Sequence, residues 1–206
     1  MEPRVHIETA RLRLRDWSDA DAAPYAALNA DPRVMEFFPA ALTREQSDAQ
    51  MAAIRTFIVN HGFGLYAAEE KASGRFVGFV GLSQPSFEAH FTPAMEIGWR
   101  LARASWGQGY ATEGARAVVD HAFGLLDLDA LVSFTAEWNR PSRRVMEKLG
   151  MTHDPAEDFL HPRLPPDHKL TRHVLYRLRR DQWRHANEKG RPADRPLQQT
   201  VKPPRY

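Results

Sequence analysis

The sequence predicts an α/β protein with a mixed β-sheet, and three segments lead to this fold class. Two apolar runs around a Ser-Gly turn in residues 64–84 indicate a β-hairpin, whose strands are antiparallel. A strand at 94–103 leads through a glycine turn into a helix at 111–126, and another strand follows at 130–138. Because a helix between two strands joins them as a parallel crossover, the sheet contains both kinds of strand pair.

The chain begins with a strand and two helices. In the segment IETARLRLRDW, Leu12 and Leu14 alternate with arginines, which is the two-residue period of a strand. Ser18 followed by Asp21 has the spacing of a capping box and starts the first helix. The second helix is expected in residues 43–60, where apolar side chains recur at helical spacing: Met51, Ile54, Phe57 and Ile58.

The strand at 94–103 presents two different faces, because successive side chains of a strand point to opposite sides. One face carries Met95, Ile97, Trp99 and Leu101 and suits a core, and the other carries Glu96, Gly98 and Arg100. The helix at 111–126 has a continuous apolar stripe, so it is expected to pack against the sheet.

The C-terminal third continues the alternation of strands and helices. Asn139 can cap a short helix that ends at Leu149, with Gly150 at the position after the C-cap. The proline-rich residues 152–169 are expected to form, in part, a long loop. The segment RHVLYRLRRDQW, residues 172–183, indicates a last strand.

The composition bounds the class of protein. The 206 residues, 43% of them apolar, suffice for the core of one domain. The absence of cysteine excludes disulfides, thiolate metal ligands and a cysteine nucleophile. The nine histidines lack ligand-like spacing, so no metal site is expected. Since no apolar run reaches the ~18 residues of a membrane span, and charges fill the start of the chain, we expect a cytoplasmic protein without a membrane partner.

The last residues differ from the rest in charge. Residues 184–206 carry six Lys or Arg against two acids, a net charge of +4, so residues 1–183 carry −2 of the overall +2. Four prolines and few apolar residues predict a mobile, basic extension of a domain that spans 1–183. Nucleic-acid contact is the alternative, but a solvated extension is favoured, because dense basic blocks and interleaved aromatics are missing.

The segment WGQGYATEG, Trp106 to Gly114, places two glycines at the junction of a strand and a helix. Such a turn directs unpaired N–H groups and the positive end of the helix dipole at one point, which suits a phosphate. A P-loop would need a Lys after Gly109, and the dinucleotide fingerprint would need a glycine at Thr112. A strand-to-helix connection with nothing bound is the alternative.

A third phosphate-binding pattern fits better. WGQGYA matches the x-G-[KQ]-G-[YL]-[AG] form of the acetyl-CoA pyrophosphate loop of the GNAT N-acetyltransferases. EWNRPSRRVMEKLGM, residues 137–151, resembles the N-x-x-S-x-x-[VL]-x-E-K-L-G-[FM] segment of the same superfamily. Residues 95–123 are similar to its RimJ/RimL-like branch, where Trp106 is usual at a position that is Gln or Arg in the general motif. The resemblance covers about residues 7–183.

The resemblance implies a fold, a cofactor and a reaction. It implies a single-domain GNAT fold, with a mostly antiparallel sheet of about seven strands flanked by helices. It implies an acetyl-CoA-dependent N-acetyltransferase, in which an amine attacks the thioester directly in a ternary complex. The amine acceptor would be a protein N-terminus or a small molecule, and a homodimer is compatible with the pattern. The residues expected to bind acetyl-CoA are Ile97, Gly98, Trp99, Gly107, Gln108, Gly109, Tyr110, Ala111, Thr112, Asn139 and Ser142.

Three residues are candidates for catalysis. Glu96 is the first candidate for the base that takes the amine proton, because it lies on the strand before the turn and opposite its apolar face. Glu137 is the second. Ser142 occupies the position that meets the CoA sulfur in related enzymes, where its hydroxyl would stabilise the thiolate by a hydrogen bond. The alternatives are a salt-bridged Glu96, a plain first-turn Ser142 and an Asn139 that only caps its helix.

Two further alternatives stay open at this stage. One aromatic of the pair Phe37-Phe38 could line an acceptor cleft, although packing in the core or a loop is favoured. The chain could also be a CoA-binding or interaction protein that has lost its chemistry on the same fold. The retention of Glu96, Asn139 and Ser142 argues against such a loss.

Overall fold

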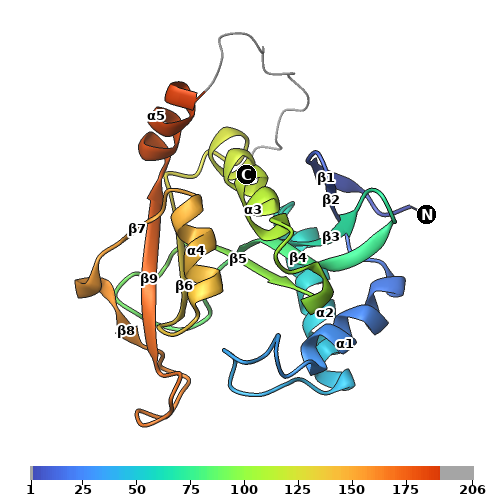
Figure 1. The fold of residues 1–206 in the computed structure, drawn as a ribbon, viewed down its shortest axis with the longest axis horizontal. Helices are drawn as coiled ribbons and strands as arrows, with labels where there is room; N and C mark the ends of the chain where they lie inside the picture. The colour runs from blue at the N-terminus through green and yellow to red at the C-terminus, as the bar shows by residue number, and fades with distance from the viewer. Residues whose placement is uncertain (1, 191–206) are drawn as a thin grey trace.

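The computed structural model describes residues 2–190, and nine strands within them form one sheet (Figure 1). The strands lie in the order β1-β2-β3-β4-β5-β6-β9-β7, and β8 pairs with β9. They are β1 (Val5–Glu8), β2 (Leu12–Arg15), β3 (Leu65–Glu70), β4 (Arg75–Ser83), β5 (Glu96–Leu101), β6 (Ala130–Ala136), β7 (Thr152–His153), β8 (Phe159–Leu160) and β9 (Arg172–Arg179). The helices are α1 (Ala22–Ala30), α2 (Arg44–His61), α3 (Tyr110–Gly124), α4 (Arg140–Lys148) and α5 (Arg180–Gly190).

The predicted fold class is confirmed. Within the described residues every strand pair is antiparallel except β5–β6, the pair joined by the crossover helix α3. The sheet has nine strands where about seven were expected. The proline-rich residues 152–169, expected in part as a loop, contribute two of them, because the two-residue strands β7 and β8 both pair with β9.

The opening segment, predicted as one strand, is two. β1 and β2 form an antiparallel hairpin, and the Thr9 N–H donates to the carbonyl of Leu12 across the turn (2.9 Å). The Thr9 hydroxyl in turn accepts the Leu12 N–H at 2.8 Å, which closes the turn. The capping box of Ser18 and Asp21 is present, but it starts a short 3₁₀ turn that leads into α1.

The predicted last strand is too long. β9 pairs with β6 up to Arg179, which faces Ala130, the first residue of β6. Since β6 offers no residue beyond that point, the chain leaves the ladder and forms α5, where the Trp183 indole donates to Asp120 of α3 (2.9 Å). Helix α5 therefore includes the first residues of the tail expected at 184–206; residues 191–206 lie outside the described part.

Helices cover both faces of the sheet. Phe79 and Val80 are neighbours on β4, so their side chains point to opposite faces. The Phe79 ring packs on Tyr25 of α1, with ring centroids 6.2 Å apart. Val80 packs on the other side against Gly114 of α3, where an added Cβ would meet Val80 Cγ2 at 3.2 Å. The core therefore fills two layers, one under α1 and α2 and one under α3.

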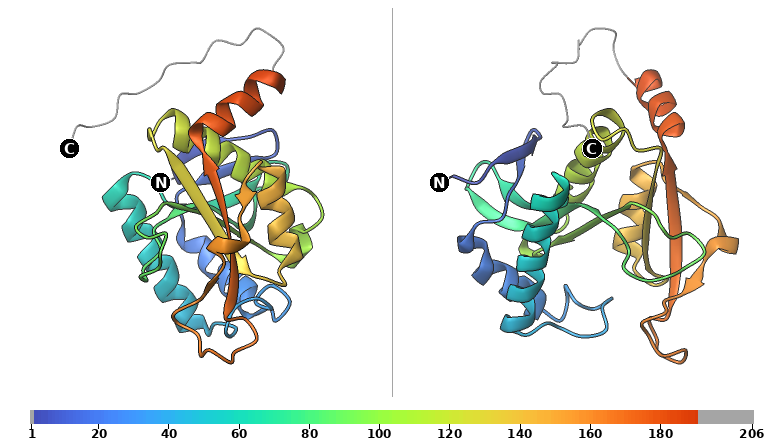
Figure 2. Two further views of the ribbon diagram at one scale, coloured as in Figure 1. Left: turned by 90° about the vertical axis from the view of Figure 1, so that its left-hand side faces the viewer. Right: turned by 180° about the vertical axis from the view of Figure 1, so that it is seen from behind.

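Strands β5 and β6 part soon after they meet. They share one facing pair, Glu96 and Val132, and the Val132 N–H donates to the carbonyl of Met95 at 2.9 Å. Beyond that pair β5 runs diagonally away from β6 in Figure 1, and Figure 2 shows the same divergence from behind. The backbone groups on the inner edge of β5 thus face an opening rather than a neighbouring strand.

In the described part of the chain, every helix is too short or too polar to cross a lipid bilayer.

Candidate active site

The glycine turn has the backbone conformation that its sequence predicts. Gly107 has φ +75° and Gly109 has φ +82°, a left-handed region that favours glycine. Gly109 is the N-cap of α3. Within residues 2–190 no acceptor binds the N–H groups from Gln108 to Thr112, so these donors and the positive end of a 15-residue helix converge on one spot. This geometry suits a phosphate.

Side chains of the predicted cofactor segment hold the turn in place. The Trp106 indole donates to the carbonyl of Leu101 at 2.8 Å, and the Gln108 amide donates to the carbonyl of Ala104 at 3.0 Å. Tyr110 is buried, and its hydroxyl donates to Glu70 of β3. The donors that remain for a ligand are therefore the backbone N–H groups.

Arg11, which the sequence reasoning missed, supports the turn from the β1–β2 hairpin. Its Nη1 donates to the carbonyl of Gln108 at 2.9 Å, and its Nε donates to Glu113 of α3 at 2.7 Å. Thr9 donates to the other oxygen of the same carboxylate at 2.6 Å. These contacts hold the pKa of Glu113 below its ordinary value, although its partial burial acts in the opposite direction. Local sequence carries no signal for such a long-range contact.

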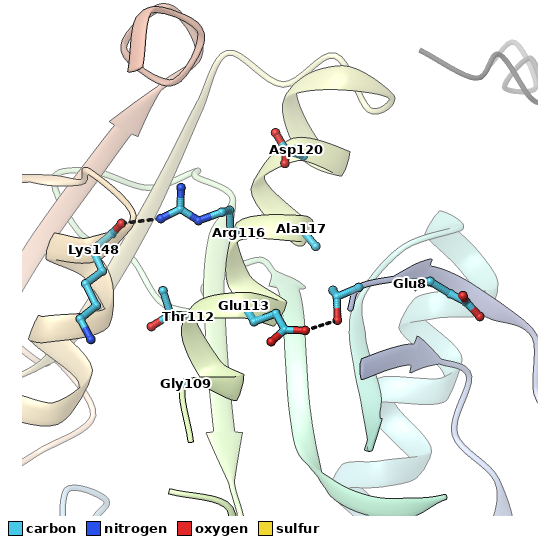
Figure 3. Close-up of a pocket in the computed structure, with 9 residues that line it drawn as sticks. Glu8, Gly109, Thr112, Glu113, Arg116, Ala117, Asp120 and Lys148 are labelled. Carbon is cyan, nitrogen blue, oxygen red and sulfur yellow. Dashed lines mark hydrogen bonds between the residues drawn. The ribbon is translucent and has the colours of Figure 1, made fainter. Parts of the chain in front are cut away.

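A groove of about 560 Å³ lies beside the turn (Figure 3). Arg116 and Lys148 border it, and the Arg116 guanidinium donates to the backbone carbonyl of Lys148 at 3.0 Å. Of its three acidic residues, Glu8 forms an ion pair with Lys71, Glu113 forms an ion pair with Arg11, and Asp120 accepts the Trp183 indole N–H. The remaining lining residues are Thr9, Gly109, Thr112 and Ala117.

Glu96 lies where β5 and β6 part. Its side chain is half-buried and accepts a hydrogen bond from the Ser83 hydroxyl at 3.3 Å. Burial raises its pKa from the ordinary 4.5 to about 7, because a charged carboxylate is poorly solvated there. A Cβ at Gly98 would lie 3.9 Å from the Glu96 Oε1, so this carboxyl lies over the bare backbone of β5.

The residues after β6 form a capped helix start. Asn139 accepts the Ser142 N–H at 3.2 Å and donates to the Thr135 hydroxyl at 2.9 Å, so the predicted N-cap of α4 is confirmed. Ser142 is half-buried in the first turn of this helix. The cap uses the backbone N–H of Ser142 and not its hydroxyl.

The two candidate carboxylates are not brought together. Glu96 faces Val132, and Glu137 follows five residues later along β6, or ~16 Å at ~3.3 Å per residue. The Glu137 carboxylate lies 3.5 Å from the Arg172 Nε of β9. No hydrogen bond joins the two carboxylates, and each has its own partner, Ser83 for Glu96 and Arg172 for Glu137.

A family model described as an acetyltransferase (GNAT) domain matches residues 11–152. This chain belongs to the GNAT acetyltransferase family. The acetyltransferase is 33% identical over 192 residues to the FsC-acetyl coenzyme A-N(2)-transacetylase of Aspergillus fumigatus, which covers 88% of this chain and 78% of the relative. It is 33% identical over 152 residues to the uncharacterised Bacillus subtilis protein YkkB, with 73% and 87% covered. An Agrobacterium tumefaciens acetyltransferase structure superposes with a TM-score of 0.68 at 28% identity, over 86% of this chain and 94% of that one.

The acetyltransferase has a second pocket, of about 240 Å³, on the α1 side of β5. Phe38, one of the aromatic pair singled out in the sequence, lines it, and so does Arg100 of β5. Phe37 is half-buried and does not line it. Figure 1 shows the segment between α1 and α2 passing below β5 toward β6, beneath the opening between the strands.

Among residues 2–190 of the acetyltransferase, no three His, Asp or Glu side chains gather as metal ligands would.

Proposed function

We propose that this acetyltransferase transfers the acetyl group of acetyl-CoA to an amine, by direct attack in a ternary complex. The observation that carries the proposal is the arrangement of three features along one segment. A half-buried glutamate with a pKa near 7 begins β5, an open strand edge follows, and a turn of free N–H groups ends the segment. The RimJ/RimL-like resemblance of residues 95–123 supports a protein N-terminal α-amine or a small amine as acceptor.

We assign the pyrophosphate of CoA to the backbone N–H groups of Gln108 to Thr112. Arg116 and Lys148 in the adjoining groove add positive charge for further phosphate. On the open edge of β5 the Ile97 carbonyl and the Trp99 N–H point away from β4 and offer backbone groups to the pantetheine amides, whereas the backbone groups of Gly98 point to β4. The second amide N–H of Asn139 is a further donor for them. Acetyl-CoA supplies the activated acyl group, a thioester carbonyl with a thiolate leaving group.

Glu96 is assigned as the base. An α-amine with a pKa near ~8 is about one-tenth neutral at pH 7, so it must lose a proton before or during attack. A carboxylate with a pKa near 7 accepts this proton, directly or through a water, with a better match than an ordinary glutamate. Glu137 remains the second candidate, but its carboxylate forms an ion pair with Arg172.

Two groups would stabilise the charge that develops. A backbone N–H on the open edge of β5, beyond its pairing with β6, would bind the oxyanion. The Ser142 hydroxyl would donate to the departing thiolate, because a serine is too weak an acid to protonate it fully but can hydrogen-bond to it.

The test is a profile of acetyl transfer over small amines and peptide N-termini, with CoA release as the readout. The name of the Aspergillus relative, an acetyl coenzyme A-N(2)-transacetylase, supports nitrogen as the atom acetylated. Transfer to at least one amine, lost in Glu96→Gln, is expected. Tight acetyl-CoA binding by calorimetry without transfer to any amine would instead favour the CoA-binding protein that lacks chemistry.

A further inference from the structure

Arg100 of β5 carries a charge that the described part of the chain does not neutralise. Its Nη1 donates to the neutral oxygen of Asn29 at 2.7 Å, and no carboxylate lies within ion-pair distance. Its Nε is fully buried and has no hydrogen-bond partner. Burial lowers the pKa of the guanidinium, which shows how poorly the charge is solvated.

Aromatic rings hold this guanidinium without using its donors. The Phe38 ring lies 4.1 Å from the Arg100 Cζ, and the Phe79 ring lies 5.4 Å from it. Stacked rings contact the flat face of a guanidinium and leave its edge for hydrogen bonds. Nη2 has no acceptor among the described residues and is not among the fully buried unpaired atoms, so it is the donor that remains for a carboxylate in the pocket.

The pocket beside Arg100 offers donors and no acid. None of its nine lining residues is Asp or Glu. Its other polar side chains are Gln46 and Gln50, and the carbonyl oxygen of each is already engaged, by the Thr43 N–H (2.9 Å) and the Tyr25 hydroxyl. Their amide NH₂ groups remain as donors. The rest of the lining is apolar: Met35, Phe38, Pro39, Ala40, Ala41 and Leu42.

The pocket lies on the same face of β5 as the proposed base. Glu96, Gly98 and Arg100 alternate on that strand, so their side chains point to one side. Four residues of strand separate the Cα atoms of Glu96 and Arg100 by ~13 Å. A molecule of modest size could therefore place an amine near Glu96 and an anionic group against Arg100.

We propose that Arg100 binds the carboxylate of the acceptor, so that the acetyltransferase acts on amines that also carry a carboxylate within ~13 Å of the nitrogen. This inference rests on the proposed function, because it names the acceptor class of the same site. An unpaired buried charge is costly unless it is compensated. A carboxylate in the pocket supplies that compensation only when the acceptor is bound.

The experiment uses straight-chain amino carboxylates of increasing length and, for each, the neutral amide. Aminocaproate and aminocaproamide are the central pair. The variants are Arg100→Gln, Arg100→Lys and a control, Arg33→Gln, which changes an exposed arginine of the α1–α2 segment outside the pocket. Acetyl transfer gives kcat and KM for each acceptor, calorimetry gives acetyl-CoA affinity, and melting temperature with and without the acceptor gives binding that needs no turnover.

The wild type is expected to favour at least one carboxylate over its amide by about tenfold or more in KM, the size of a charged hydrogen bond. Arg100→Gln should abolish this preference while the amide, acetyl-CoA affinity and the control stay unchanged, and Arg100→Lys should keep part of it. Equal loss for carboxylate and amide, or weaker acetyl-CoA binding, would make Arg100 a structural or cofactor residue and overturn the inference.

The failure of the two proposals can be told apart. Transfer that is equal for every carboxylate and its amide overturns the carboxylate site and leaves the acetyl transfer standing. If no amine of the series or of the wider panel is acetylated, the proposed function fails. The melting temperatures then test the carboxylate site by themselves. Stabilisation of the wild type by an amino carboxylate, absent with the amide and absent in Arg100→Gln, would still support the site; its absence would overturn it.

Discussion

Arg11 of the β1–β2 hairpin and Glu113 of α3 form an ion pair beside the glycine turn of the candidate cofactor site. The Nη2 of Arg11 lies 2.6 Å from one carboxylate oxygen of Glu113, and the backbone N–H of Arg11 donates to the other at 2.9 Å. The same guanidinium holds the Gln108 carbonyl and lies over the Tyr110 ring, 4.7 Å from its centroid. The pair thus fixes the direction of the glycine turn relative to α3.

Arg11→Ala is therefore expected to weaken acetyl-CoA binding by about tenfold and to leave kcat nearly unchanged. The N–H donors stay, but they lose the contact that orients them before the ligand arrives, which costs binding energy. The measurements are kcat and KM for acetyl-CoA from the transfer reaction, and the acetyl-CoA affinity from calorimetry, for the wild type and the variant. Arg55→Ala is the matched control, since it removes another exposed ion pair, with Asp19, far from the turn. Equal affinity in both variants would remove Arg11 from the site.

Gly109→Val should weaken acetyl-CoA binding strongly while the fold survives. Gly109 has a positive φ, which strains any residue with a branched side chain, and an added Cβ would meet only the Arg11 Nη2, at 3.5 Å. A larger side chain at this position would therefore press on Arg11, which holds the turn, while the strained φ would shift the N–H donors. Gly74→Val introduces a similar strain, at φ +68° in the β3–β4 turn, and serves as the control.

Both variants should lose comparable thermal stability, but calorimetry should show weaker acetyl-CoA binding for Gly109→Val alone. An unchanged affinity in folded Gly109→Val protein would contradict the assignment of the pyrophosphate to this turn.

Ser142→Ala should slow transfer and spare acetyl-CoA affinity. The thiolate charge develops only as the reaction proceeds, so a contact made only then lowers kcat and kcat/KM together. Helix α4 should keep its stability, because the cap depends on the Asn139 side chain and the Ser142 backbone. Asn139→Ala provides the contrast, with an expected loss of about 1 kcal/mol of stability. A wild-type kcat in Ser142→Ala would reduce Ser142 to a helix residue.

The local elements of this site could be read from the sequence, whereas the contacts across the sheet could not. Glycine at 107 and 109 predicts positive φ, and Asn139 predicts a cap, because each depends on a few adjacent residues. Arg11 and Arg100 acquire their roles from partners on other elements, Glu113 and Phe38, to which no local pattern points. The excess length predicted for the last strand has the same origin, since β6 decides where pairing stops.

The pH dependence of transfer tests Glu96. Because its pKa is about 7, the wild-type kcat/KM should rise with pH through about pH 7, as the carboxylate form accumulates. Glu96→Gln should lose about two to four decades in rate at neutral pH, the usual worth of a positioned base. The deficit should shrink as pH approaches the pKa of the amine itself, because the acceptor then arrives neutral.

Stability supplies a second, independent signature of the same residue. The folded protein holds a proton on Glu96 between its ordinary pKa of 4.5 and about 7, where the unfolded chain has released it. More protons bound in the folded state mean that stability falls as pH rises through this window. Glu96→Gln removes that fall, so its melting temperature should gain on the wild type from about pH 5 to pH 8.

Glu137→Gln is the control for both measurements, because this carboxylate lies by Arg172 of β9. It should keep the wild-type pH profile of kcat/KM. A Glu96→Gln deficit that stays constant from about pH 6 to pH 9, or that is confined to KM, would show that Glu96 does not withdraw the proton. Glu137 would then be the carboxylate to test next, with the same pair of pH profiles and the roles of the two variants exchanged.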